Sequence, residues 1–252
     1  MSNCDCDFTT SGATVVEPEL LAFMKATWVQ DPIEKRFPDQ SLWIWEPCNY
    51  QKDYIVVADV ARGDGSDYSA CHVIDVETAE QVAEFKAQVG TTEFGHILVN
   101  LAVEYNNAML VIENANIGWA TCQTVIDRHY PNLYYSFKDI NYVDQSTLGK
   151  NFDLRDKANM VPGFTTSIRS RPLIIGRMEL YFRERECRFK SVRMYNELLN
   201  FVWKSGKAQS QQGYNDDLVM AWAIGLWTRD HAIKLRQQGI SLNKSAISNL
   251  TM

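Results

Sequence analysis

Four acidic side chains stand where a fold can bring them together. Asp59 and Glu113 each end a short apolar run that is typical of a buried strand. Asp216 and Asp217 begin a long apolar pattern with helical spacing, and negative charge is favoured at the start of a helix. Each placement is common by itself, so the prediction rests on the combination of three distant segments.

Carboxylates that converge repel one another unless a cation lies between them. Hard carboxylate oxygens select Mg²⁺ or Mn²⁺ over zinc. Two such ions, roughly 3.5–4 Å apart, can activate water and stabilise the leaving oxygen of a phosphodiester. We therefore expect a site for metal-dependent phosphodiester hydrolysis. Its expected ligands are Asp59, Glu113 and Asp217, with Asp216 sharing or replacing the role of Asp217.

The first two acids belong to a predicted mixed sheet. Three successive strands between residues 54 and 89, with tight turns, indicate an antiparallel meander. Residues 91–94 then open a predicted helix, and apolar positions at helical spacing continue it to residue 105. A strand, a helix and a further strand in succession favour parallel pairing through a crossover. These last elements are predicted over 109–113, 118–129 and 133–137.

The doubled acid belongs to the last predicted helix. Residues 138–168 show no clear period and are expected to form a long loop. After this loop we predict helices over 172–185 and 195–200, a short strand over 201–203, and a long helix from Asp216 to about Gln237 that Asn215 caps.

The chain is expected to divide into a lead-in, one domain and a tail. Residues 1–50 are interrupted by prolines and predict an extended lead-in with one short helix over 20–29. Residues 51–240 form the predicted domain, and residues 241–252 the tail. A length of 252 residues, with 46% hydrophobic and 22% charged residues, fits an ordinary soluble domain.

Composition excludes several classes of protein. No apolar run approaches 18 residues, and the N-terminus lacks the pattern of a secretory signal, so we expect no membrane span and a cytoplasmic location. The six cysteines lack paired zinc-ligand spacing, because only Cys4 and Cys6 are close. Reduced thiols are therefore expected. The four histidines are scattered and are expected to be structural.

Basic residues are concentrated in one segment. The net charge is −6, yet residues 169–193 hold eight basic and three acidic residues, a local charge of +5. A basic surface on an acidic body suits contact with the phosphates of DNA. The residues predicted to edge a groove for duplex DNA are Lys138, Lys150, Arg155, Arg169, Arg171 and Arg177.

Three motifs resemble those of a known family. The segment Asp59-Val-Ala-Arg-Gly-Asp-Gly-Ser-Asp-Tyr-Ser-Ala70 resembles the first nuclease motif of the tailed-phage large terminase subunit, in its T4-like branch. Val111-Ile-Glu-Asn114 resembles the second motif, and Gly213-Tyr-Asn-Asp-Asp-Leu-Val-Met-Ala221 resembles the third. The resemblance extends from about residue 10 to residue 237, and the motifs agree in order and spacing.

The resemblance implies an α/β fold of the RNase H-like, retroviral-integrase type, with a mixed central sheet flanked by helices. It also implies a two-metal endonuclease that cuts concatemeric double-stranded viral DNA during packaging, with low sequence specificity. Asp59 and Glu113 would be metal ligands, and Asp217, Asp216 or both would supply the third. Asp67 would reach the second metal or its water, a role for which Asp64 competes.

The family's large subunit also carries an ATPase domain. This sequence has no G-x-x-x-x-G-K-[ST] motif, because the segment 90–96 has the glycine spacing without the lysine. We therefore expect an isolated nuclease domain that follows a missing ATPase. The implied partners are double-stranded DNA, the portal ring and the small terminase subunit, in the host cell cytoplasm.

Two alternatives stay open. One is a Holliday-junction resolvase or transposase-type nuclease on the same fold, which the long lead-in and the turn at residues 67–69 disfavour. The other is a non-catalytic module that docks on DNA or on the portal. Retention of all three acidic motifs disfavours that module.

Overall fold

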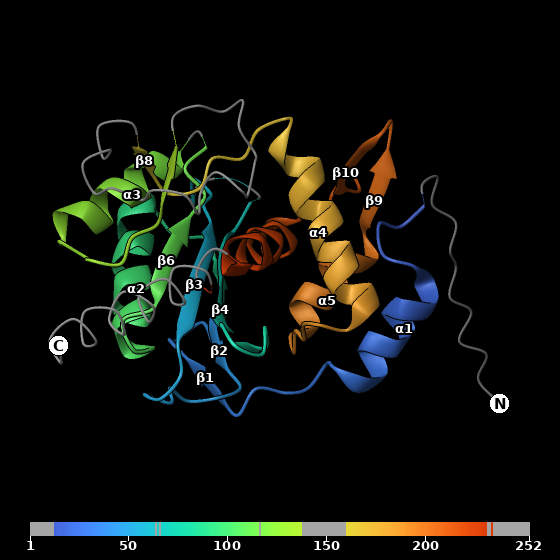
Figure 1. Cartoon of the computed structure of the whole chain (residues 1–252), viewed down its shortest axis with the longest axis horizontal. Coiled ribbons are helices and arrows are strands. Elements are labelled where there is room, and N and C mark those ends of the chain that lie inside the picture. Colours follow the sequence, from blue (N-terminus) through green and yellow to red (C-terminus); the bar gives the residue numbers. More distant parts are fainter. Residues whose placement is uncertain are drawn as a thin grey trace, which may run out of the picture.

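The computed structural model describes residues 13–63, 65, 67–115, 117–137, 160–230 and 233. A six-stranded mixed sheet lies at its centre (Figure 1). Neighbouring strands pair antiparallel except β3 and β6, which are parallel. The predicted parallel pairing of 109–113 with 133–137 is limited to one bridge, between Leu110 and Leu133. The spatial order is β1 (Glu34–Arg36), β2 (Leu42–Ile44), β5 (Gln81–Ala87), β4 (Ser69–Asp75), β3 (Tyr54–Asp59) and β6 (Met109–Ile112).

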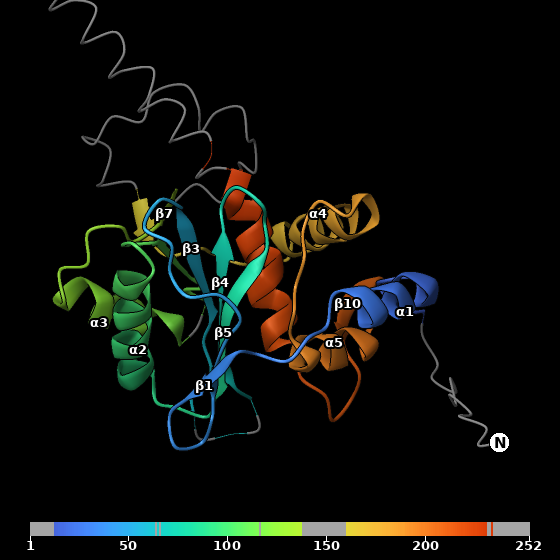
Figure 2. The same cartoon turned by 90° about the horizontal axis from the view of Figure 1, so that it is seen from below.

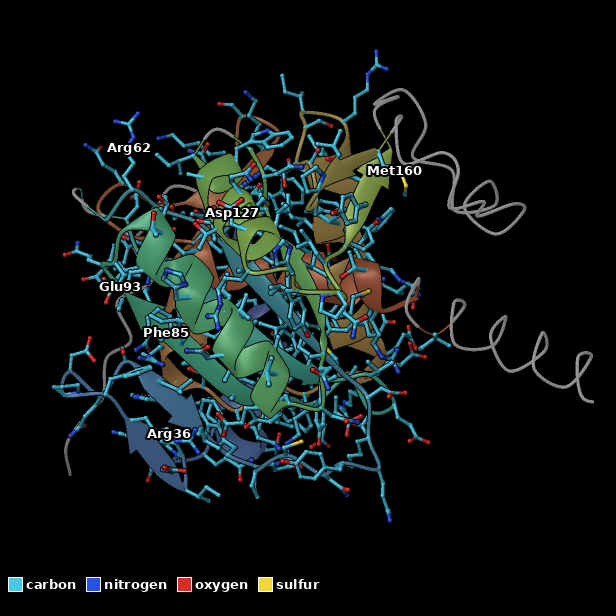
Figure 3. The ribbon with its side chains drawn as sticks, turned by 90° about the vertical axis from the view of Figure 1, so that its left-hand side faces the viewer. Arg36, Arg62, Phe85, Glu93, Asp127 and Met160 are labelled. Carbon is cyan, nitrogen blue, oxygen red and sulfur yellow. The ribbon has the colours of Figure 1, made fainter. Side chains whose placement is uncertain are left out.

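Helices cover both faces of this sheet. On one face lie α2 (Thr91–Glu104) and α3 (Gly118–Asp127), which Figure 3 shows from outside. The last helix, described over 217–230, lies against the other face. It runs between the sheet and a further layer that contains α4 (Ser170–Glu184) and α5 (Val192–Leu199), as Figures 1 and 2 show. The predicted mixed sheet flanked by helices is confirmed.

The last helix is enclosed by the sheet and by the outer helices. Leu218, Trp222 and Leu226 are all fully buried. A helix that is apolar on all sides is stable only when it is surrounded in this way. Gly225 brings it close to β3, because a Cβ at this position would lie 2.8 Å from a side-chain carbon of Val57.

Strand alternation assigns each residue of β3 to one of two cores. Ile55 and Val57 pack with the last helix, whereas Val56 and Ala58 pack on the side of α2 and α3. Asp59 shares the parity of Ile55 and Val57. Its side chain therefore belongs to the face that the last helix covers.

Two hairpin-like pairs lie outside the main sheet. β7 (Tyr135–Phe137) pairs with β8 (Met160–Pro162), and β9 (Phe201–Lys204) pairs with β10 (Lys207–Ser210). The prediction of a loop throughout 138–168 is therefore wrong at β8, a strand too short to show a period. Residues 138–159 lie outside the described part of the chain.

The described part of the predicted lead-in differs from the expectation. Its short helix is confirmed as α1 (Pro18–Thr27). However, β1 and β2 extend the central sheet, so this segment is not merely an extended lead-in. Strands of three residues between prolines show no alternation that a sequence pattern can reveal. The domain boundaries near residues 50 and 240 stay predictions.

The helices that lead toward the doubled acid begin earlier than predicted. α4 starts at Ser170, two residues before Pro172. α5 starts at Val192, because the Ser191 side chain accepts hydrogen bonds from the first free amides of the helix.

None of the described helices is long and apolar enough to cross a membrane.

Candidate metal centre

Asp59 and Glu113 lie side by side at one edge of the sheet. In the parallel pairing of β3 with β6, Ala58 is the partner of Ile112, and the Glu113 amide donates to the Ala58 carbonyl at 2.9 Å. Asp59 and Glu113 are each one residue further along. Val111 packs with the last helix, so Glu113, two residues later, shares the face of Asp59.

The backbone behind Glu113 is tightly packed. A Cβ at Gly118, the first residue of α3, would lie 1.9 Å from the Glu113 carbonyl oxygen, so only glycine fits there. Asn114 is buried; its amide donates to the Pro162 carbonyl at 2.7 Å and accepts from Thr165 at 2.9 Å. The second motif thus supplies one acid and one side chain that fastens the end of β6 to β8.

Asp217 reaches this edge from the last helix. One oxygen of its carboxylate accepts from the Tyr68 backbone amide at 3.2 Å and from the Asn215 side chain at 3.1 Å. The predicted helix start is wrong by one residue, because Asp217 is the first helical residue. The predicted cap is also wrong: the helix amides of Leu218 and Val219 donate to the carboxylate of Glu197.

The carboxylates share one electrostatic field. The pKa of Asp59 is raised well above its usual value, first by burial, then by the charge and a hydrogen bond of Glu113, and further by Asp217 and Asp216. Burial also raises the pKa of Asp217, which the hydrogen bonds from Asn215 and Tyr68 partly offset. The charges of three other acids, from two other segments of the chain, therefore act on Asp59.

The two neighbouring acids of the third motif face different partners. Asp216 forms an ion pair of 2.7 Å with Arg171 of α4. The charges of both acids raise the pKa of Asp59, and that of Asp217 does so more than that of Asp216. Arg171 thus engages Asp216 and not Asp217.

The donor chemistry at this edge fits a hard divalent cation. All the groups are carboxylates, and each of Asp59, Glu113 and Asp217 keeps part of its surface accessible. Within the described residues, no lysine or arginine forms an ion pair with any of these three. In the same residues, no three His, Cys, Asp or Glu side chains already form a metal-binding group. The carboxylates are thus gathered, and Asp59 and Glu113 share a hydrogen bond where a cation would separate them.

The other predicted ligands and DNA contacts differ in their exposure and in their ion-pair partners. Asp67 is exposed on the turn between β3 and β4. Arg177 pairs with Asp230 at 2.7 Å, whereas Arg169 is exposed at the start of α4. Arg171 is engaged with Asp216. The remaining predicted residues, Asp64, Lys138, Lys150 and Arg155, lie outside the described residues.

Three residues near the centre were not predicted from the sequence. Lys86 forms an ion pair with Glu197, and Glu197 caps the helix that carries Asp217. His72, expected only to be structural, lies 2.9 Å from the Leu218 carbonyl through Nε2. Lys86, Glu197 and His72 stand in no recognisable motif. The only signal is that Lys86, like Glu84, alternates with apolar residues along β5.

No protein-family model matches the chain. Its structure is similar to the large terminase nuclease from thermophilic phage G20c with bound magnesium, at a TM-score of 0.63 and 15% identity, over 86% of this chain and 98% of that chain. The cobalt-bound form of the G20c nuclease gives a TM-score of 0.61 at 14% identity, over 86% and 97% of the two chains. The large terminase nuclease domain of Thermus phage P74-26 gives 0.57 at 16% identity, over 83% and 94%.

These likenesses cover almost the whole of each solved domain. At such low sequence identity, a structural likeness establishes the fold alone. They agree with the family that the three motifs indicated, and the RNase H-like fold expected from that resemblance is confirmed. The chain has the RNase H-like fold of the nuclease domains of phage large terminases.

Proposed function

We propose that the chain is the nuclease domain of a phage large terminase subunit. It cleaves concatemeric double-stranded viral DNA during genome packaging into the capsid, with low sequence specificity. The observation that carries the proposal is the convergence of Asp59, Glu113 and Asp217 at one edge of this fold. The bound magnesium and cobalt of the similar G20c nuclease structures support a divalent cation at such a centre.

Asp59, Glu113 and Asp217 are the proposed ligands. Asp59 and Glu113 are fixed by adjacent strand ends, so their carboxylates are held rigidly. Asp217 is favoured over Asp216 as the third ligand, because Asp216 is engaged with Arg171. Asp67, which is exposed on the turn between β3 and β4, is proposed to serve a second ion or its water.

Asp59, Glu113 and Asp217 would hold Mg²⁺ or Mn²⁺, as one ion or two, which would supply the Lewis acidity for activating water and stabilising the leaving oxygen of the phosphodiester. The protein's own contribution is to gather negative charge and hold it in a fixed arrangement. Burial at the sheet edge makes that charge costly without a cation, which favours metal binding. No side chain of the chain needs to act as a nucleophile.

Backbone contacts are proposed to hold the DNA, so binding is weak in sequence preference and steeply dependent on salt. Arg62 follows Asp59 by three residues, is exposed, and extends away from the body of the domain (Figure 3). Arg169 is exposed at the start of α4. These two, with the predicted Lys138, Lys150 and Arg155, form the proposed rim.

The proposed setting is the packaging motor in the host cell cytoplasm. In the full-length protein an ATPase domain precedes the nuclease, and the assembly engages the portal ring and the small terminase subunit. The ATPase would move the DNA that this domain cuts.

The test is cleavage of supercoiled plasmid by the purified chain in Mg²⁺, in Mn²⁺ and in EDTA. We expect nicked and linear products with either ion and none in EDTA. Asp59→Asn removes cleavage, whereas Asp53→Asn, an exposed acid at the opposite end of β3, leaves it intact. Undiminished cutting by a folded Asp59→Asn variant rejects the assignment.

A further inference from the structure

Lys86 belongs to the same row of side chains as Asp59. Asp59 of β3 is paired with Ala70 of β4, and Ala70 is paired with Lys86 of β5. Paired residues on neighbouring strands project from the same face of a sheet. Lys86 therefore lies two strands from Asp59, roughly 9–10 Å away, on the face that the last helix covers. In this row Ala70 is the residue between them.

The ammonium group of Lys86 has two partners inside the protein. It forms an ion pair with Glu197 of α5 and lies 4.8 Å from the centroid of the Tyr68 ring. The Lys86 side chain is 15% exposed and that of Glu197 is 6% exposed. A cation so enclosed is poorly placed to bind the phosphates of DNA, so its task lies inside the domain.

Glu197 joins Lys86 to the backbone that follows Asp217. One of its carboxylate oxygens faces Lys86. The other accepts from the amides of Leu218 at 2.8 Å and Val219 at 3.1 Å. The first amides of a helix have no partner within the helix. Because this cap comes from α5, it fixes where the helix begins relative to α5 and β5.

Tyr68 joins Lys86 to the Asp217 side chain. The Tyr68 backbone amide donates to the Asp217 carboxylate at 3.2 Å, and its ring lies against Lys86. Asp217 is thus reached from Lys86 by two routes. One passes through Tyr68 to the carboxylate, and the other passes through Glu197 to the helix backbone.

Stability alone does not account for a buried ion pair at this place. The cost of removing two charges from water largely offsets their attraction, and apolar replacements are often as stable. The specific result of the Lys86–Glu197 contact is geometric, because it sets the start of the helix that carries Asp217.

We propose that Lys86 and Glu197 are a positioning pair that holds Asp217 in register with Asp59 and Glu113 for metal binding. The inference rests on the proposed function. Neither residue is a proposed ligand; both act through Asp217. Loss of a group that orients a metal ligand costs about 10–100-fold in metal affinity or activity.

The test is Mn²⁺ binding to the whole chain without DNA, measured by titration calorimetry for the wild type, Lys86→Gln, Lys86→Arg and Lys190→Gln. Lys190 is the matched control, since its side chain is 4% exposed and pairs with Glu46 and Glu80, the latter just before the far end of β5. We expect Lys86→Gln to weaken Mn²⁺ binding about 10–100-fold. Lys86→Arg keeps most of the affinity, and Lys190→Gln keeps all of it even where its melting temperature falls.

The outcomes separate this inference from the proposed function. A Lys86→Gln variant with wild-type Mn²⁺ affinity, or an equal loss in Lys190→Gln, overturns the positioning role alone. A wild-type chain that does not bind Mn²⁺ contradicts the proposed function and this inference with it. DNA affinity in EDTA is measured in parallel and is expected to be unchanged in Lys86→Gln. If Lys86→Gln loses as much DNA affinity in EDTA as it loses Mn²⁺ affinity, Lys86 is assigned to DNA contact instead.

Discussion

Nη2 of Arg171 lies 2.7 Å from Oδ2 of Asp216, so the two adjacent acids of the third motif differ in their surroundings. Asp216 is paired with α4, and its charge raises the pKa of Asp59 less than the charge of Asp217 does. This difference favours Asp217 as the acid that a metal ion would meet.

The first prediction compares these two acids. Asp217→Asn lowers the single-turnover rate of plasmid cleavage by at least about 10²-fold, the loss expected for a group that stabilises the transition state directly. Asp216→Asn breaks a partly exposed ion pair, which contributes about 1 kcal/mol or less, and lowers the rate much less. Equal losses in the two variants would show that the ion pair does not divide their roles.

A second prediction concerns the pH dependence of stability without metal. The pKa of Asp59 is raised in the folded protein, so the folded state keeps a proton that the unfolded chain releases above about pH 4. Stability therefore falls as the pH rises from about 4 through the folded pKa. Asp59→Asn removes this loss, and in EDTA at neutral pH it melts at a higher temperature than the wild type. Thermal melts across this pH range test the sign, and a lower melting temperature for the variant contradicts it.

Addition of Mn²⁺ is expected to reverse the order of the melting temperatures of the wild type and Asp59→Asn. The wild type gains melting temperature as Mn²⁺ is added, because the ion binds only the folded state, while Asp59→Asn gains little. A variant stabilised as strongly as the wild type would place the ion elsewhere.

The third prediction uses a glycine. Gly118→Ala places a Cβ against the Glu113 carbonyl oxygen, so the backbone must shift and the domain loses about 1–3 kcal/mol of unfolding free energy. Displacement of Glu113 also slows cleavage. Gly176→Ala is the control, because its Cβ meets no atom within 4 Å on α4. The control gains about 0.5–1 kcal/mol from helix propensity, and urea denaturation measures both effects.

His72 provides the fourth prediction. Its Nε2 bonds to the Leu218 carbonyl at 2.9 Å, and its Nδ1 lies 2.7 Å from the Gln81 side-chain nitrogen, all of it buried. A carbonyl only accepts, so Nε2 carries the proton and Nδ1 accepts from Gln81. Burial lowers the pKa of His72, which favours this neutral form.

His72→Phe keeps the ring volume and removes two buried hydrogen bonds, one to the Leu218 carbonyl and one to the Gln81 amide, which keeps its bond to Glu84. Each lost bond costs about 0.5–1.5 kcal/mol, so the variant should unfold at lower urea concentration than the wild type. A midpoint equal to that of the wild type would mean that water or a rearranged Gln81 replaces the imidazole.

Local patterns made part of the site predictable. Asp59 and Glu113 end apolar runs, which predicted that each stands at the end of a strand of one sheet. The parallel pairing of β3 with β6, which makes them neighbours, was not predicted. The division between Asp216 and Asp217 did not follow, because it depends on Arg171, 45 residues away along the chain.

Lys86 shows why the residues that support the site could not be predicted from the sequence. In β5, polar Glu84 and Lys86 alternate with apolar Ala83 and Phe85, a pattern typical of a strand with one face in solvent. That face is instead covered by the last helix and α5, and Glu197 lies 111 residues from Lys86 in the chain. Alternation identifies the two faces of a strand but not what covers them.

Asp59, Glu113 and Asp217 are proposed to bind one divalent cation together. Anomalous X-ray scattering from crystals of this chain soaked in Mn²⁺ tests this arrangement. We expect an anomalous peak in contact with oxygens of all three carboxylates, with Asp216 still paired to Arg171. A peak bound elsewhere, or no peak while these carboxylates remain in direct contact, would contradict it.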